Sequence, residues 1–307
     1  MRPFKGIALK LCSVFLFMVM SALVKAASEA VPPGQAVFFR SVFAIPVILI
    51  WLIWRHELRT GLRVTSRMGH VWRGVVGTTA MGLMFAGLGL LPLPEVTALG
   101  YTAPLLVVIF AAMFLDEKVG VFRISAVLLG LAGVIVVLSP RLTALDNPAA
   151  DTAQTVGAIL VLLGATCAAL AQIYIRKLVQ TEQTSAIVFY FSLTSTLLSL
   201  LTLPFGWAIP GGTETVMLIS AGMIGGLAQI FLTASYRYAD ASVIAPFDYT
   251  SMLFAIGIGY VFFDEVPTRQ MLAGAALIVL AGIIIILRER QLGLKRGQAR
   301  ALKTPQG

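Results

Sequence analysis

Long apolar stretches separated by short polar segments dominate this chain. Ten of them approach the roughly 20 residues that a helix needs to cross a bilayer. They lie at residues 6–26, 34–54, 74–92, 94–115, 121–139, 157–176, 184–204, 214–235, 242–263 and 271–288. The stretches lack the alternation of barrel strands, and only helices and closed barrels satisfy the backbone in lipid. The pattern predicts an all-α integral membrane protein with ten transmembrane helices.

The second half of the chain repeats the first at a constant offset of 148 residues. Residues 74–117 align without a gap on 222–265, matching a Tyr-Thr pair and, fifteen residues later, an Asp-Glu pair. Five helices per repeat is an odd number, so the second repeat starts from the opposite membrane face. Such inverted repeats are typical of transporters with a midplane site. We expect repeat 1 at 6–139, a periplasmic linker at 140–156, repeat 2 at 157–288 and a basic cytoplasmic tail at 289–307.

Composition and charge agree with a membrane location. Hydrophobic residues make up 58% of the chain and charged residues 12%, and the mean hydropathy is +0.92. With both termini in the cytoplasm, 18 of the 23 Lys and Arg fall in inner segments and three in outer ones, as the positive-inside rule requires. We therefore expect a multi-pass protein of the bacterial inner membrane. The basic tail is interpreted as binding anionic headgroups rather than nucleic acid.

Four segments carry a family resemblance: FLDEKVGVFR, FFDEVPTRQ, AQIYIRKLVQTE and LTASYRYADASVIAPFDYTS. Through them the chain resembles the drug/metabolite transporter superfamily, in its ten-helix group built from two EamA domains. The resemblance implies a small-molecule permease with a cavity between helices three, four, eight and nine. It also places the APFDYTS segment near riboflavin importers and S-adenosylmethionine carriers. Riboflavin uptake is our leading specific hypothesis. Amino-acid, S-adenosylmethionine or drug transport is the alternative, and a membrane subunit without its own flux is the alternative from another class.

Polar differences between the aligned halves indicate candidate site residues. Asp248 and Gln229 occupy positions where the first repeat has Gly and Met. A charge near a helix centre costs roughly 2.5 to 3.5 kcal/mol in the membrane, which favours a function for Asp248, such as proton coupling. A neutral Asp248, or one paired with Arg237, is the structural alternative. Pro246 removes a backbone donor two residues earlier and is a candidate opening in the helix.

Aromatic residues in corresponding positions are the next candidates. The repeat places Tyr101 and Tyr249 as a facing pair that could stack on a planar ligand, with Thr102 and Thr250 beside them. Phe85 is a weaker candidate for the same surface. Ordinary helix packing is the alternative for all three aromatic residues.

Charged residues near the membrane boundaries complete the candidates. Arg40 lies within the second apolar stretch. It either extends outward or meets Glu29, or it binds an anion or acts in gating. The acidic helix ends, including Glu265, are expected to be solvated, with a contact to Arg269 as the gating alternative.

Enzyme chemistry has no support in the sequence. The chain has no H-E-x-x-H, no G-x-S-x-G and no G-x-x-x-x-G-K-[ST] segment. His56 and His70 are expected in a basic loop outside the membrane. We expect no catalytic residue, metal or cofactor, and transport that is facilitated or coupled to protons or another ion. Oligomeric state and transport direction stay open.

Overall fold

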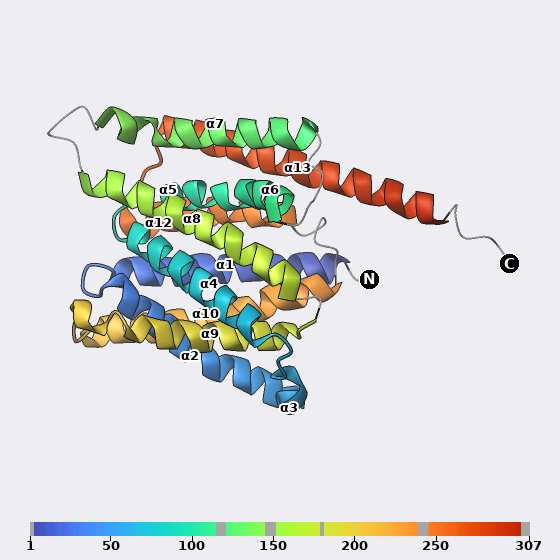
Figure 1. Cartoon of the computed structure of the whole chain (residues 1–307). Coiled ribbons are helices and arrows are strands. Elements are labelled where there is room, and N and C mark those ends of the chain that lie inside the picture. The colour runs from blue at the N-terminus through green and yellow to red at the C-terminus, as the bar shows by residue number, and fades with distance from the viewer. Residues whose placement is uncertain (1–2, 115–120, 145–151, 179–180, 239–244, 302–307) are drawn as a thin grey trace.

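The computed structural model describes residues 3–114, 121–144, 152–178, 181–238 and 245–301, and the regular structure in these residues is helical. The helices form one bundle (Figure 1). The long helices are α1 (Pro3–Ala27), α2 (Pro33–Trp54), α4 (Arg67–Leu88), α7 (Val121–Ala144), α8 (Thr152–Leu178), α9 (Thr184–Leu200), α10 (Gly212–Tyr238) and α13 (Arg269–Ala301). The shorter ones are α3 (Leu58–Gly61), α5 (Leu93–Gly100), α6 (Thr102–Phe114), α12 (Thr250–Phe263) and the 3-10 helices η1 (Leu203–Phe205) and η2 (Ala245–Tyr249).

The surface of the bundle is apolar, as lipid contact requires. Ile50, Trp54 and Phe262 are 66%, 81% and 74% exposed, and many other large apolar side chains also face outward. Patches of this extent are rare on water-soluble monomers. Seven helices in the described residues are long and apolar enough to cross a membrane, and three shorter apolar helices accompany them. The predicted all-helical membrane fold is therefore confirmed.

Helix packing brings distant parts of the chain together. α1 packs along α10, α4 lies on α8 and α9, α2 lies on α9 and α10, and α7 pairs with α13. In Figure 1, α7 and α13 form one side of the bundle and α2 and α9 the other. The start of α1, the end of α13 and the short helix α3 lie at the same end, which we call the terminal end. The loop between α1 and α2 marks the opposite, distal end.

Glycines allow the closest of these contacts. A Cβ on Gly133 of α7 would lie 2.7 Å from the carbonyl oxygen of Gly274 on α13. A Cβ on Gly222 of α10 would lie 2.6 Å from Cβ of Phe43 on α2. The two pairs of helices therefore approach more closely than larger residues at these positions would permit.

Two differences from the sequence-based helix boundaries have a local cause. α4 begins at Arg67 rather than at residue 74, because the Ser66 hydroxyl accepts a hydrogen bond from the Gly69 amide at 3.3 Å and caps the helix. The stretch predicted as one helix at 94–115 is interrupted at Tyr101, which separates α5 from α6. Pro104 has no N–H to donate to Gly100, so the helix restarts with Pro104 in its first turn.

The predicted linker and tail are also partly helical. α7 continues to Ala144 and α8 begins at Thr152, so both ends of the expected linker 140–156 belong to helices. α13 continues through the basic segment to Ala301. Hydropathy marks where lipid contact ends, whereas a helix continues for as long as its residues favour helix formation.

Candidate functional site

A cavity of about 260 Å³ opens between α1, α4, α5 and α12. Its lining consists of Met18, Ser21, Met84, Phe85, Leu88, Leu93, Val96, Thr97, Gly100, Tyr101 and Ser251. A mostly apolar wall with a few hydroxyl groups is typical of small-molecule sites. The resemblance implied a cavity between the third, fourth, eighth and ninth helices. The first helix, α1, lines this cavity instead of the eighth, because α1 packs along α10.

Tyr101 and Tyr249 meet at two interruptions in helical structure. Tyr101 separates α5 from α6, and Tyr249 ends η2 immediately before α12. Their ring centroids are 5.1 Å apart at an interplanar angle of 72°. The hydroxyl groups of Tyr101 and Ser251 are hydrogen-bonded, and Tyr101 also donates to the Tyr249 carbonyl oxygen at 3.3 Å. The rings contact each other edge to face in this conformation, so no planar group lies between them.

The other polar and aromatic candidates are spread around this centre. Phe85 is 5% exposed and lines the cavity. Thr102 is buried, and its hydroxyl oxygen has no hydrogen-bond partner within the described part of the chain. The Thr250 hydroxyl donates to the Phe247 carbonyl oxygen at 2.6 Å. Gln229 lies half-buried on α10 and is not part of the cavity lining. The structure therefore groups Phe85 and Tyr101 at one cavity and keeps Gln229 apart from it.

Asp248 forms an ion pair that the sequence did not reveal. Its Oδ1 lies 2.7 Å from Nζ of Lys10 on α1, whose side chain is 2% exposed, whereas the side chain of Asp248 is 50% exposed. We had considered Arg237 as the structural partner. Pro246 lies with Asp248 in η2, so the ninth apolar segment enters its helix through a 3-10 turn. This turn places the carboxylate against α1.

A polar network joins three parts of the chain at the distal end. Nζ of Lys25 lies 3.0 Å from Oε1 of Glu265 and donates to the carbonyl oxygens of Leu88 and Leu91 at 3.1 and 2.7 Å. The Leu93 amide donates to Oε2 of Glu265 at 2.8 Å. Both charged side chains are largely buried, with 14% and 13% exposure. Our expectation of a solvated Glu265, with Arg269 as its alternative contact, is wrong.

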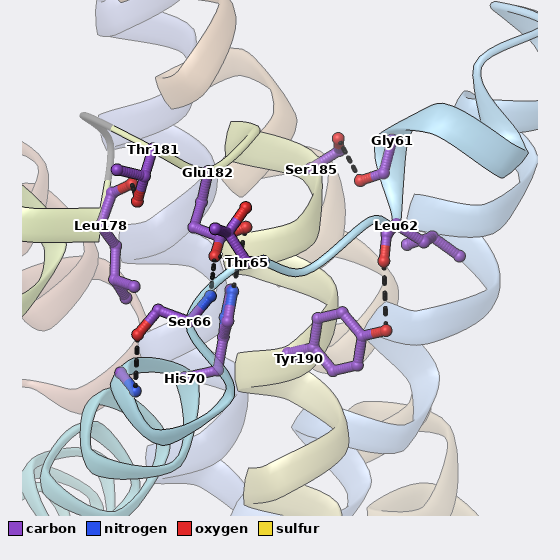
Figure 2. A network of polar contacts seen from close by, with 11 residues as sticks. Gly61, Leu62, Thr65, Ser66, His70, Leu178, Thr181, Glu182, Ser185 and Tyr190 are labelled. Atoms are coloured by element: carbon purple, nitrogen blue, oxygen red, sulfur yellow. Dashed lines mark hydrogen bonds and ion pairs between the residues drawn. The ribbon is translucent and has the colours of Figure 1, made fainter.

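A second network closes the terminal end (Figure 2). The amides of Thr65 and Ser66 donate to Oε1 of Glu182, and Nε2 of His70 lies 3.6 Å from Oε2. Burial acts to raise the pKa of Glu182, but the two amide hydrogen bonds and His70 outweigh it and lower that pKa from 4.5. His70 lies in the first turn of α4 and is 5% exposed. The expectation that His70 lies in a basic loop is therefore wrong.

The same network ties the loop before α4 to α9. The Ser185 hydroxyl donates to the Gly61 carbonyl oxygen at 2.8 Å, and the Tyr190 hydroxyl donates to the Leu62 carbonyl oxygen at 3.2 Å. Figure 2 shows these contacts beside Glu182. The two networks therefore link separate helices at opposite ends of the bundle.

Arg40 is buried rather than extended outward. It is 5% exposed, and its Cζ lies 5.7 Å from the ring centroid of Phe191 on α9. Glu29, the partner we had considered, is exposed and forms no ion pair with Arg40. Arg73 lies within α4, with its Cζ 3.7 Å from the same ring.

The bundle, its apolar surface and its internal cavity define a multi-pass α-helical membrane protein. The chain belongs to the EamA-like transporter family of the drug/metabolite transporter superfamily, whose profile matches residues 4–139 and 155–288. The profile of solute carrier family 35 also matches residues 93–206. The sequence resemblance to this superfamily is thereby confirmed.

Similar proteins are transporters with different named cargoes. The pseudopaline exporter CntI of Pseudomonas aeruginosa is 32% identical over 284 residues, covering 91% of this chain and 95% of that protein. A riboflavin transporter of Rhizobium johnstonii is 28% identical, with coverage of 85% and 83%. An S-adenosylmethionine uptake transporter of Rickettsia felis is 27% identical, with coverage of 84% of each chain. These relatives support a general transport function and give no support to an enzyme.

A solved crystal structure shares the fold. It superposes with a TM-score of 0.65 at 20% sequence identity and covers 92% of this chain and 97% of its own. At this identity the likeness concerns the fold alone.

Proposed function

We propose that the protein is a secondary transporter that carries a small polar metabolite across the bacterial inner membrane by alternating access. It would cross the membrane ten times as two inverted five-helix repeats, at 6–139 and 157–288, with both termini in the cytoplasm. The observation that carries this proposal is the cavity between α1, α4, α5 and α12, with polar networks joining separate helices at the two ends of the bundle. Opening one network while the other holds would expose the cavity to one side at a time.

The proposed substrate contacts follow from the cavity. Phe85 and Tyr101 form its aromatic part, and Tyr249 contacts the Tyr101 ring. Thr102, Thr250 and Gln229 are the polar candidates. Binding of a planar ring requires the two tyrosine rings to separate or the ring to stack from the cavity side, since they now contact each other. Asp248, Pro246 and Arg40 are proposed to act in coupling or gating.

Riboflavin uptake is the specific function that we propose first. The aromatic wall suits a planar ring system, and a riboflavin transporter is among the relatives. Amino-acid or drug export and uptake of S-adenosylmethionine are the other candidates, because an exporter and an S-adenosylmethionine transporter are also among them. Restored growth of a riboflavin auxotroph lacking uptake would support the first candidate. Absence of rescue despite verified membrane expression would remove it.

Counterflow in proteoliposomes tests transport itself. Purified protein should exchange a labelled metabolite from a panel of riboflavin, S-adenosylmethionine and amino acids with saturable kinetics. Tyr101→Ala should weaken the apparent affinity by about 1 to 3 kcal/mol if a ring stacks there. Tyr260→Ala is the matched control, because Tyr260 is 63% exposed on α12. No counterflow of any panel member would favour the membrane subunit without its own flux.

Coupling is tested at Asp248. If this carboxylate carries a proton, Asp248→Asn should abolish accumulation driven by a proton gradient and preserve counterflow without a gradient. The alternative is that Asp248 has a structural role through its ion pair with Lys10. If the pair only stabilises the contact between η2 and α1, the substitution should lower both activities together, and the coupling proposal would be rejected.

A further inference from the structure

Two arginines meet at one aromatic ring inside the bundle. Arg40 of α2 and Arg73 of α4 approach Phe191 of α9, with Cζ-to-centroid distances of 5.7 and 3.7 Å. Nε of Arg40 and both Nε and Nη1 of Arg73 are buried and have no hydrogen-bond partner among the residues that the structure describes. Each guanidinium has five N–H donors, and buried donors without acceptors are costly. The ring face offsets only part of this cost.

Two other basic residues in the interior have acidic partners, whereas Arg40 and Arg73 have none among the described side chains. Lys10 is paired with Asp248 and Lys25 with Glu265. Within the described part of the chain, no acidic side chain forms an ion pair with Arg40 or Arg73. Both guanidinium groups lie against the same Phe191 ring, at 5.7 and 3.7 Å from its centroid, so their like charges repel each other. Two positive charges therefore lie near each other in the interior, and no described acidic side chain neutralises them.

The position of Arg73 shows that its side chain is directed inward. Helical side chains normally tilt toward the start of their helix, and a basic residue near a membrane boundary usually extends to the headgroups. Nη1 of Arg73 instead lies beside Gly77, one turn further along α4, where an added Cβ would overlap it. Gly225 of α10 lies beside Arg40, where an added Cβ would make ordinary contact with Nε at 3.5 Å. Gly77 therefore leaves room for the guanidinium group of Arg73.

We propose that Arg40 and Arg73 form an anion subsite that holds a carboxylate group of the transported metabolite. The inference rests on the transport function proposed above and adds a class of substrate to it. A guanidinium matches the planar geometry of a carboxylate and can bind it through two parallel hydrogen bonds. One carboxylate between the two groups would supply acceptors to the buried donors and reduce their mutual repulsion.

Thermal unfolding of the purified full chain, followed by the fluorescence of its four tryptophans, tests the subsite. The probe is succinate, and succinamide is the uncharged molecule with the same carbon skeleton. The protein is kept in uncharged detergent, and chloride holds the ionic strength constant. Succinate should raise the melting temperature with a saturable dependence on concentration, and succinamide should not. Arg40→Gln and Arg73→Gln should each weaken the apparent Kd for succinate about tenfold to a hundredfold.

Matched variants separate the subsite from general effects of charge. Gly77→Ala keeps both charges and displaces Arg73, so it should also weaken succinate binding. Gly82→Ala is its control on the same helix, because an added Cβ there meets no atom within 4 Å. Arg55→Gln is the control for loss of an arginine, since Arg55 lies in an ion pair with Glu57 near the surface. If the Gln variants do not fold, the two alanine variants decide the question.

Three outcomes would overturn the proposal. They are no stabilisation of the wild-type protein by succinate, equal stabilisation of all variants, and stabilisation only by added phosphatidylglycerol. The last result would assign the arginines to a lipid phosphate. The protein could also exchange an uncharged metabolite in the counterflow assay while succinate does not stabilise it. That result would keep the proposed transport function and reject only the subsite.

Discussion

Glu265→Gln tests whether the distal network holds the cavity closed from that side. The substitution removes the negative charge that lies 3.0 Å from Nζ of Lys25 and changes the side-chain volume very little. The network includes the Leu88 carbonyl group and the Leu93 amide, and both residues line the cavity. Weakening the network should therefore increase access to the cavity from the distal side.

The expected size of the effect follows from the contacts that remain. A hydrogen bond to a charged group contributes about 1.5 to 3 kcal/mol. The amide oxygen of Gln can still accept from the Leu93 amide, and Lys25 keeps its bonds to the Leu88 and Leu91 carbonyl oxygens. We therefore expect the closed state to lose about 1.5 kcal/mol, the lower limit of this range. This loss corresponds to roughly a tenfold rise in the population of the open state.

Cysteine labelling measures this population. A cysteine introduced at Thr97, which lines the cavity, reports access, after replacement of Cys12 and Cys167 by serine and alanine. A membrane-impermeant maleimide is added to intact cells, and the rate of labelling is compared with and without Glu265→Gln. If the closed state dominates and closing is fast, the labelling rate should rise by the same factor of about ten.

The control is the same substitution in an ion pair elsewhere. Glu57→Gln breaks the pair of Glu57 with Arg55, which is 2.7 Å long and lies near the surface beside α3. It should leave the labelling rate unchanged. An unchanged rate in Glu265→Gln, or an equal rise in Glu57→Gln, would refute the assignment of a closing role to the distal network.

Two further predictions concern stability. The lowered pKa of Glu182 means that its ionised form stabilises the folded protein above pH 4.5, and that this contribution is lost as the pH falls through the lower folded-state pKa. The melting temperature of the wild-type protein should therefore fall more steeply below pH 4.5 than that of Glu182→Gln. Gly282→Ala should destabilise the protein by about 2 kcal/mol through overpacking, because the new Cβ would overlap the Tyr249 hydroxyl. Gly257→Ala, whose Cβ meets no atom within 4 Å, should show no such loss in melting temperature.

The apolar periodicity predicted the helices better than it predicted their ends. Long apolar runs must be helical in lipid, whatever their neighbours are. The start of α4 depends instead on the Ser66 cap, and the interruption at Tyr101 depends on Pro104. Both signals are visible in the sequence. Hydropathy alone does not register them, because a cap and a proline change the helix boundary without changing how apolar the segment is.

Contacts between distant residues could not be predicted in the same way. The repeat identified Tyr101 and Tyr249 as corresponding positions, and their rings are in contact. Nothing in the repeat relates Asp248 to Lys10, because their contact depends on how η2 packs against α1. The partner of an interior charge is therefore a property of packing and not of spacing along the chain.

Arg73 shows why charge counting can conceal a site. The positive-inside rule counts each basic residue near a membrane boundary toward one side of the membrane, whichever way its side chain is directed. Arg73 lies six residues after the start of α4, about 9 Å along the helix axis, and its side chain extends further inward to Gly77. A basic residue whose side chain is directed inward adds one to the count of inner Lys and Arg, as does one whose side chain is directed outward. Only the inward side chain has a desolvation cost. Arg40 and Arg73 have this desolvation cost and no acidic partner among the described residues. That combination is the physical argument for a ligand at these two residues.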